Sequence, residues 1–142
     1  MINKIIDGIS IALNAEFGDN YKIHTESVKQ GLKEPCFFIV CLNPTNNQFM
    51  GNRYFRQNQF DIHYHPKSTD EKQQECMDVE ERLFDCLELI IIDDGLQKGT
   101  QMHGEMVDGV LHFFVNYDMF VYKIKNQADP MASMGLETKM KG

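Results

Sequence analysis

The sequence predicts an α+β fold, in which two helices pack on one face of a mainly antiparallel sheet. Three observations predict it. Two segments repeat apolar residues at helical spacing, other segments alternate apolar and polar residues, and the strands fall in two runs instead of alternating with helices. The 142 residues suit one domain. We expect it to span residues 1–125, in the order α-β-β-β-α-β-β with long projecting hairpins, and to be followed by a flexible tail over 126–142.

The first element is expected to be an amphipathic helix that ends before Gly18. Five apolar residues fall on one helical face: Ile2, Ile5, Ile6, Ile9 and Leu13. Gly18 followed by Asp19 and Asn20 is a stop and turn signal. A short strand is expected next, over residues 21–26.

A long hairpin is expected to follow. The apolar run 36–42, between Pro35 and Pro44, is typical of a buried strand. The Asn-rich segment 43–52 predicts a turn or an extended hairpin tip. Residues 53–65 alternate as a half-buried strand does. One side of that strand carries Phe60, Ile62 and Tyr64, and the other carries Gln59, Asp61, His63 and His65.

The second half of the chain predicts a helix and another hairpin. Ser68 and Glu71 have the spacing of a capping box. The helix that they open has an apolar stripe: Cys76, Val79, Leu83, Leu87 and Ile90. Residues 96–107 predict an edge strand, Asp108-Gly109 predicts a hairpin turn, and residues 111–121 alternate as one long strand.

Composition excludes several partners. The net charge of −7 argues against nucleic acid and against an anionic membrane surface. The N-terminus lacks the pattern of a secretory signal, and no run approaches the roughly 18 apolar residues of a membrane span.

The cysteines form no metal-binding pair, and we expect buried, reduced thiols of a cytoplasmic protein: Cys36, Cys41, Cys76 and Cys86.

Catalytic motifs are not evident. Nucleophile elbows, phosphate loops and dinucleotide motifs are missing from the sequence, so neither an enzyme nor a cofactor is expected. His63-x-His65, with Asp61 beside it, could bind a metal if His112 or His24 supplied a third ligand. Solvated histidines on an exposed strand face are the commoner explanation, and we expect no metal. The alternative is a metal-dependent hydrolase that uses His63 and His65.

The most interface-like residues lie at the start of the strand 53–65. Arg and aromatic residues are favoured at the centres of protein interfaces. Arg and aromatic side chains can also stack on bases, but the acidic composition favours a protein partner over nucleic acid. The expected subunit or partner interface has six residues: Phe49, Met50, Arg53, Tyr54, Phe55 and Arg56.

Three segments carry a resemblance to a known family. They are EPCFFIVCLNPTNNQFMGNRYFRQNQFDIHYHP, DVEERLFDCLELI and DGVLHFFVNYDMFVYK. With the order of elements, they resemble the tail terminator and tail-completion proteins of Firmicute phages and phage-tail-like bacteriocins, from contractile, PBSX-like tail modules. The resemblance covers residues 1–125.

The resemblance implies a structural role. It implies a homo-oligomeric, hexameric ring that caps the tail tube, ends tube growth and contacts tube protein, with sheath or neck protein as further partners. It carries over no active site. From the acidic composition we expect neither a membrane nor sequence-specific nucleic acid as a partner. The resemblance also implies assembly in the host cytoplasm and incorporation into the tail particle. A head–tail connector or neck protein is the neighbouring alternative.

Overall fold

A computed structural model describes residues 1–26, 32–93 and 95–123, and in this part the expected α+β class is confirmed. The tail expected over residues 126–142 lies outside the described residues. In chain order the elements are α1 (Ile2–Phe17), β1 (Lys22–His24), β2 (Cys36–Met50), β3 (Arg53–His65), α2 (Lys72–Cys86), β4 (Leu89–Ile92), β5 (Gly95–Lys98), β6 (Thr100–Val107), β7 (Val110–Asn116) and β8 (Met119–Tyr122).

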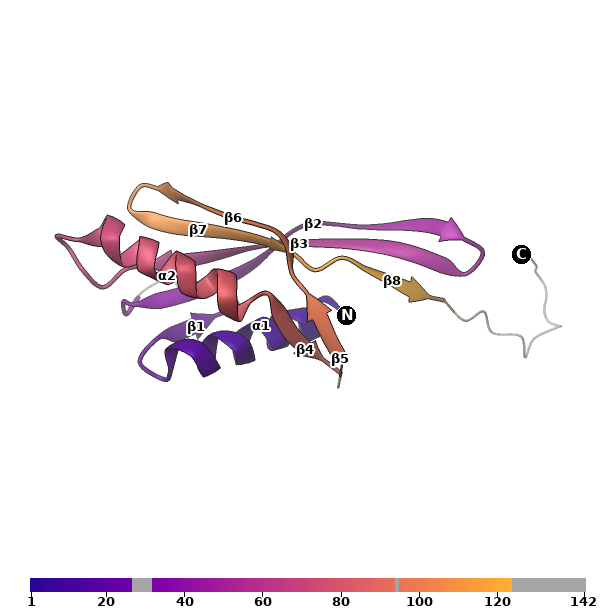
Figure 1. The fold of residues 1–142 in the computed structure, drawn as a ribbon, viewed down its shortest axis with the longest axis horizontal. Helices are drawn as coiled ribbons and strands as arrows, with labels where there is room; N and C mark the ends of the chain where they lie inside the picture. The colour runs from indigo at the N-terminus through magenta and orange to yellow at the C-terminus, as the bar shows by residue number, and fades with distance from the viewer. Residues whose placement is uncertain (27–31, 94, 124–142) are drawn as a thin grey trace.

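The main sheet is mixed but mostly antiparallel. Its strand order is β1-β2-β3-β7-β6, and β8 pairs with β3 beyond the end of β7. The short β1 runs parallel to β2, and the other pairings described in this sheet are antiparallel. β4 and β5 form a separate two-stranded sheet. In Figure 1 the β2–β3 hairpin runs well past both helices, and β8 lies along its far half.

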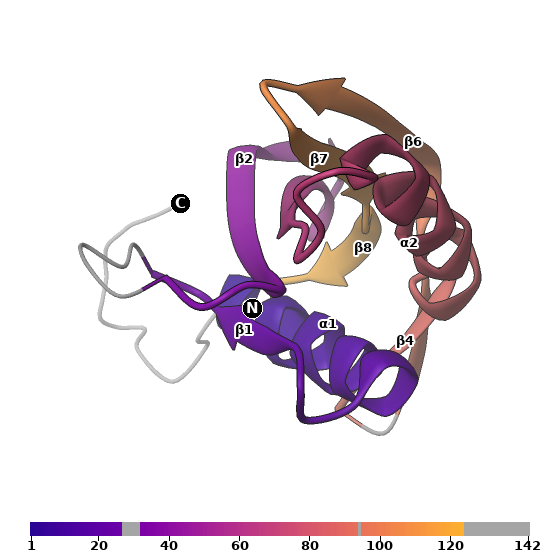
Figure 2. The same ribbon diagram turned by 90° about the vertical axis from the view of Figure 1, so that its left-hand side faces the viewer.

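Both helices pack on one face of the main sheet and close a single core (Figure 2). The helical stripes bury Ile5, Ile9 and Leu13 from α1, and Val79 and Leu83 from α2. Alternate strand residues meet them from the sheet: Phe37, Ile39, Phe60, Ile62, Tyr64, Leu111, Phe113 and Val115. Each fully buried side chain of this size contributes about 1.5–3 kcal/mol. The opposite sheet face, which points away from α1 and α2, is called the outer face below.

The start of α2 differs from the expected capping box. The helix begins at Lys72, about one turn later than the sequence suggested. The acidic residue in its first turn is therefore Glu75 and not Glu71. Glu75 accepts hydrogen bonds from the N–H groups of Lys67 and Ser68, both at 2.8 Å, and from the Tyr64 hydroxyl. Ser68 Oγ still accepts the Glu71 N–H at 2.9 Å. Glu75 thereby ties α2 to the end of β3.

The end of α2 also corrects the sequence interpretation. The helix stops at Cys86, and Ile90, expected on its stripe, belongs to β4. Leu87 and Ile90 are buried in the same core, which is why helical spacing seemed to continue. The isoleucine-rich run is β-branched and pairs with β5. It packs against α1 at Gly8, where an added Cβ would lie 2.8 Å from the Ile91 carbonyl oxygen.

The strand expected over 111–121 is interrupted at Tyr117 and Asp118, which separate β7 from β8. The Tyr117 N–H donates to the Asn58 carbonyl at 2.8 Å, and the Asn58 side chain donates to the Tyr117 carbonyl at 3.0 Å. The Asp118 carboxylate accepts the Asn58 N–H at 3.1 Å. At this joint β3 changes partners, from β7 to β8. The part beyond it, residues 45–57 and 119–122, is called the arm.

The cysteines are free, as expected, but only Cys36 and Cys76 are buried, whereas Cys41 and Cys86 are half-buried. Burial raises the pKa of Cys36 and Cys76 to about 11 and that of Cys86 to about 12, so these thiols are protonated at neutral pH. Neither helix of the described residues is long and apolar enough to span a membrane.

Candidate functional site

The arm is a three-stranded extension of the main sheet, in which β3 pairs with β2 on one side and with β8 on the other. At its tip Gly51 adopts φ 55°, a conformation that glycine tolerates, and Met50 pairs with Arg53. The Gln48 side chain donates to the Gly51 carbonyl at 2.8 Å. At its base the ladder shifts register between Leu42 and Thr45. That irregularity accommodates Pro44, which cannot donate to a ladder.

One side of the arm carries an aromatic cluster around Phe120. The ring centroid of Phe120 lies 5.4 Å from that of Phe49 and 4.9 Å from that of Phe55. The Arg53 guanidinium lies over the central ring and one of the outer rings, 4.7 Å from the Phe120 centroid and 5.2 Å from that of Phe49. Phe49 is 55% exposed and Phe120 46% exposed. These four residues, called the arm cluster, have the composition of an interface centre.

The six residues that the sequence suggested as an interface do not form one surface, because they lie on two opposite sides of the arm and at its tip. Phe49, Arg53 and Phe55 join the arm cluster, and Met50 is exposed at the tip. Tyr54 lies on the opposite side of the arm, where Lys123 Nζ is 4.2 Å from its ring. Arg56 shares that side and donates through Nε to the Asn46 side chain at 3.3 Å.

Phe120, the centre of the arm cluster, was missed by sequence reasoning. Its apolar alternation was visible, but the sequence placed it in one strand that continued from residue 111. Only the change of partner at Asn58 brings Phe120 opposite Phe55. The spacing between the two segments could not reveal this register.

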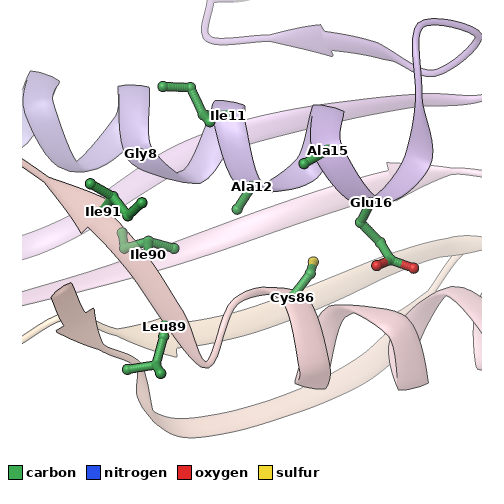
Figure 3. Close-up of a pocket in the computed structure, with 9 residues that line it drawn as sticks. All are labelled: Gly8, Ile11, Ala12, Ala15, Glu16, Cys86, Leu89, Ile90 and Ile91. Atoms are coloured by element: carbon green, nitrogen blue, oxygen red, sulfur yellow. The ribbon is translucent and has the colours of Figure 1, made fainter.

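A second exposed apolar surface lies on the body, between α1 and β4 (Figure 3). It is a groove of about 320 Å³. Its lining is Gly8, Ile11, Ala12, Ala15, Glu16, Cys86, Leu89, Ile90 and Ile91. Ile11, Leu89 and Ile91 are each more than half exposed, and Leu96, which pairs with Ile91, is exposed beside them. This surface is called the body groove. Like the arm cluster, it is typical of an interaction site.

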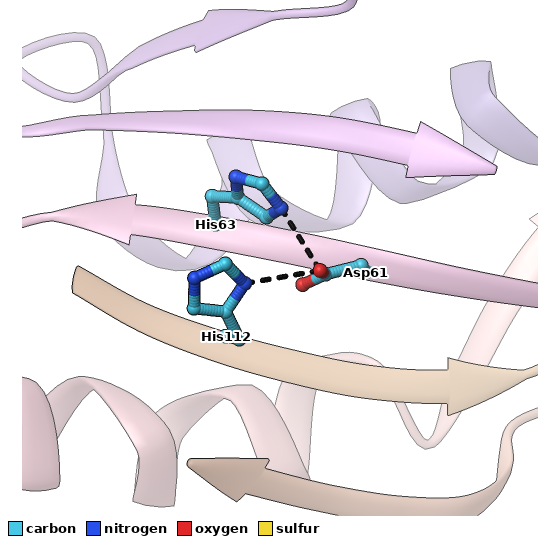
Figure 4. Close-up of side chains that lie close together, drawn as sticks. All are labelled: Asp61, His63 and His112. Atoms are coloured by element: carbon cyan, nitrogen blue, oxygen red, sulfur yellow. Dashed lines mark hydrogen bonds and ion pairs between the residues drawn. The ribbon is translucent and has the colours of Figure 1, made fainter. Parts of the chain in front are cut away.

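The outer face carries a third feature, the group Asp61, His63 and His112 (Figure 4). Asp61 Oδ2 lies 2.9 Å from His63 Nε2 and 3.0 Å from His112 Nδ1. Burial acts to raise the pKa of Asp61, but the hydrogen bonds and charges of the two histidines outweigh it and hold that pKa below its usual range. Asp61 is therefore an ionised carboxylate at neutral pH.

The suggested metal pair His63 and His65 is corrected by this geometry. The strand alternation does put both on the outer face, but the ligand atoms that converge belong to Asp61, His63 and His112. His65 lies outside that group and packs edge-on against Phe38, with ring centroids 5.3 Å apart. His24 stacks on the same Phe38 ring at 4.9 Å. The sequence left His112 and His24 as candidates for the third ligand. The register of β3 and β7 selects His112, which lies opposite His63.

The chain is similar to a known family of proteins. The model of a family described as phage tail terminator protein matches residues 4–129. The match includes the arm, the body groove and the outer face. No curated protein matches the chain.

Proposed function

The chain belongs to the phage tail terminator family, and from this premise we propose that it caps the tail tube as a hexameric ring. Membership gives the chain a structural part in tail assembly and makes it a component of the virion particle. In the proposal the ring ends tube polymerisation after assembly in the host cytoplasm. Its free side meets sheath or neck protein. On the resemblance described above, the tail is a contractile, PBSX-like one.

The arm carries the proposal. A closed ring with cyclic symmetry needs a heterologous interface, in which two different patches of each subunit meet. The described residues offer two such patches, the arm cluster and the body groove. They lie on different elements, and the arm projects away from the body (Figure 1). We propose that the arm of each subunit docks in the body groove of the next.

The two surfaces are complementary in chemistry. The arm cluster presents aromatic rings, and Met50 adds a flexible apolar side chain at the tip. The body groove presents aliphatic side chains and carries Glu16 at its rim. Arg53 Nε is buried and has no hydrogen-bond partner in the described part of the chain. Within the subunit Glu16 Oε2 accepts from Arg82 Nε at 2.9 Å. In the proposed contact the other carboxylate oxygen of Glu16 accepts from Arg53, and an Arg–carboxylate bond of this kind is strong when desolvated.

The side of the arm opposite the arm cluster is the proposed contact surface for the tube protein. Tyr54 and Arg56 point away from the arm cluster. If the arm cluster is buried between subunits, these two residues remain available for the tube protein. We propose that this side rests on the last ring of the tube. The role so described requires no catalytic group and no cofactor.

Native mass spectrometry of the full chain, alone and with tube protein, tests the proposal. The wild type is expected to form a closed ring in at least one of the two conditions. Phe49→Ser combined with Phe120→Ser should abolish the ring and leave a folded monomer, because both side chains are exposed within the subunit. Met77→Ser, an exposed methionine on α2, is the matched control and should assemble normally. A strict monomer in both conditions would overturn the proposal.

A further inference from the structure

We propose that Asp61, His63 and His112 form a binding site for a divalent transition metal ion, of which Zn²⁺ is the type. The site lies on the outer face of the sheet, in the body and apart from the arm. It therefore stands independently of the ring proposed above. Its expected effect is to link β3 to β7 through one ion.

Strand geometry puts the three ligands together. Asp61 and His63 are two residues apart on β3 and so share a face. His112 on β7 is directly opposite His63. The ligand atoms of the three side chains all lie within 4.8 Å of one another. Tetrahedral zinc at bond lengths of about 2.0–2.2 Å separates its ligand atoms by about 3.4 Å. The largest of these separations therefore has to close by at most about 1.4 Å, which rotations of the two imidazole rings can supply.

Asp61 gives the second observation. It is only 7% exposed, and its Oδ1 atom is buried without a hydrogen-bond partner among the residues that the structure describes. A buried carboxylate oxygen without a partner is costly. The ring nitrogens of both histidines contact Oδ2, and neither contacts Oδ1. A cation between the three side chains would compensate the carboxylate charge directly and would replace two hydrogen bonds by stronger bonds to metal.

The donor set selects the ion. Two imidazoles and one carboxylate suit zinc and its first-row neighbours. Mg²⁺ and Ca²⁺ prefer sites built from oxygen. The side chains of His63 and His112 are 28% and 21% exposed, so an ion can reach them from solvent. Three protein ligands leave one tetrahedral position for water or for a group from another molecule.

The same three residues could instead form a hydrogen-bonded group with no metal, in which Asp61 accepts two imidazole N–H bonds. Two other histidines on this face provide controls for that alternative. His65 packs against Phe38, and His103 stacks on Phe114 with ring centroids 4.8 Å apart. Neither is among the converging ligands in the described residues. A metal held by the proposed site should therefore be insensitive to both.

Cobalt absorption of the full chain, purified without an affinity tag, tests the site. Co²⁺ is expected to bind at one equivalent with the intense visible bands of a tetrahedral ion, and Zn²⁺ should displace it, whereas Mg²⁺ should not. His63→Gln and His112→Gln should each weaken binding at least about tenfold, since loss of a supporting outer partner alone costs 10–100-fold. His65→Gln and His103→Gln should bind as the wild type does.

Fold integrity is controlled by circular dichroism of each variant without metal. Asp61→Asn is a third variant and should also weaken Co²⁺ binding. If this substitution at a buried position unfolds the protein, the two histidine variants decide the test. Zn²⁺ should also raise the Tm of the wild type, because it binds the folded state, and should leave that of His112→Gln unchanged. Wild-type protein that shows no saturable Co²⁺ binding up to about 1 mM would overturn the proposal, as would folded His112→Gln protein that binds Co²⁺ as tightly as the wild type.

Discussion

The Asn58 side chain donates a hydrogen bond of 3.0 Å to the Tyr117 carbonyl, and the Tyr117 N–H donates one of 2.8 Å to the Asn58 carbonyl. Asn58 is almost completely buried. The pair stands where β3 leaves β7 for β8, so it connects the body to the arm. In the proposed ring, this joint holds the arm in one position relative to the body.

Asn58→Ala is expected to destabilise the protein by about 1–3 kcal/mol, because it leaves the Tyr117 carbonyl without its buried donor. Urea unfolding measures the change. Relative to the wild type, the exchange of backbone amide hydrogens should also speed up more over Met119–Tyr122 than over β7. The neighbouring Gln57 is exposed, and Gln57→Ala should change stability by no more than about 0.5 kcal/mol. Equal effects of the two substitutions would show that the joint is not special.

Glu75 makes stability depend on pH. Burial acts to raise its pKa, but the hydrogen bonds from Tyr64, Lys67 and Ser68 outweigh it and lower that pKa. A carboxylate with a depressed folded pKa stabilises the fold above its unfolded pKa, about 4.3. This contribution is lost as pH falls through the folded value.

Glu75→Ala should therefore cost roughly 1.5–3 kcal/mol at pH 7 and should lose less stability than the wild type between about pH 5 and pH 3. Urea unfolding at several pH values measures both quantities. Asp78→Ala, an exposed acidic residue of the same helix, is the control. A variant whose stability falls with acid as steeply as that of the wild type would contradict this account of Glu75.

Gly8 tests how closely α1 packs on β4. Helix propensity alone would make Gly8→Ala stabilising by about 1 kcal/mol. An added Cβ, however, would lie 2.8 Å from the Ile91 carbonyl oxygen and 3.3 Å from Ile90 Cδ1. We expect a net loss of about 1–3 kcal/mol, measured as a lower Tm. Ser10→Ala in the same helix should be neutral or slightly stabilising. A higher Tm for Gly8→Ala would show that the contact yields easily.

Ile91 tests the body groove from the other side of the proposed interface. Its side chain is 63% exposed, so Ile91→Asp should leave the monomer folded. A charge in the groove should nevertheless prevent docking of the aromatic arm cluster, as burial of an unpaired carboxylate is costly. Size-exclusion chromatography with light scattering should show loss of the ring. Val107→Asp, at an exposed strand end outside the groove, should assemble. Normal assembly of Ile91→Asp would remove the groove from the interface.

Local signals of the sequence were sufficient for much of the fold. The alternation of Phe60, Ile62 and Tyr64 correctly identified the core side of β3, and Asp108-Gly109 correctly marked the β6–β7 turn. Both depend on neighbours in sequence. Ile90 shows the limit of such signals, since it is buried and fits a helical stripe and a strand equally well. Its strand conformation is decided by pairing with β5 and by contact with α1.

The candidate sites were harder to predict because they depend on register. Asp61 and His63 were placed together correctly from strand alternation. The third member, His112, is 51 residues from Asp61 in sequence, and only the pairing of β3 with β7 selects it over His24. Phe120 reaches the arm cluster for a similar reason, through the change of partner at Asn58.

Tube polymerisation followed by electron microscopy tests the central claim most directly. Tube protein is allowed to polymerise with and without the chain. With the wild type, tubes should stop short and carry a ring at one end, whereas Phe49→Ser combined with Phe120→Ser should give tubes as long as those of tube protein alone. Tubes whose lengths are unaffected by the wild-type chain, with no added ring at either end, would contradict the claim.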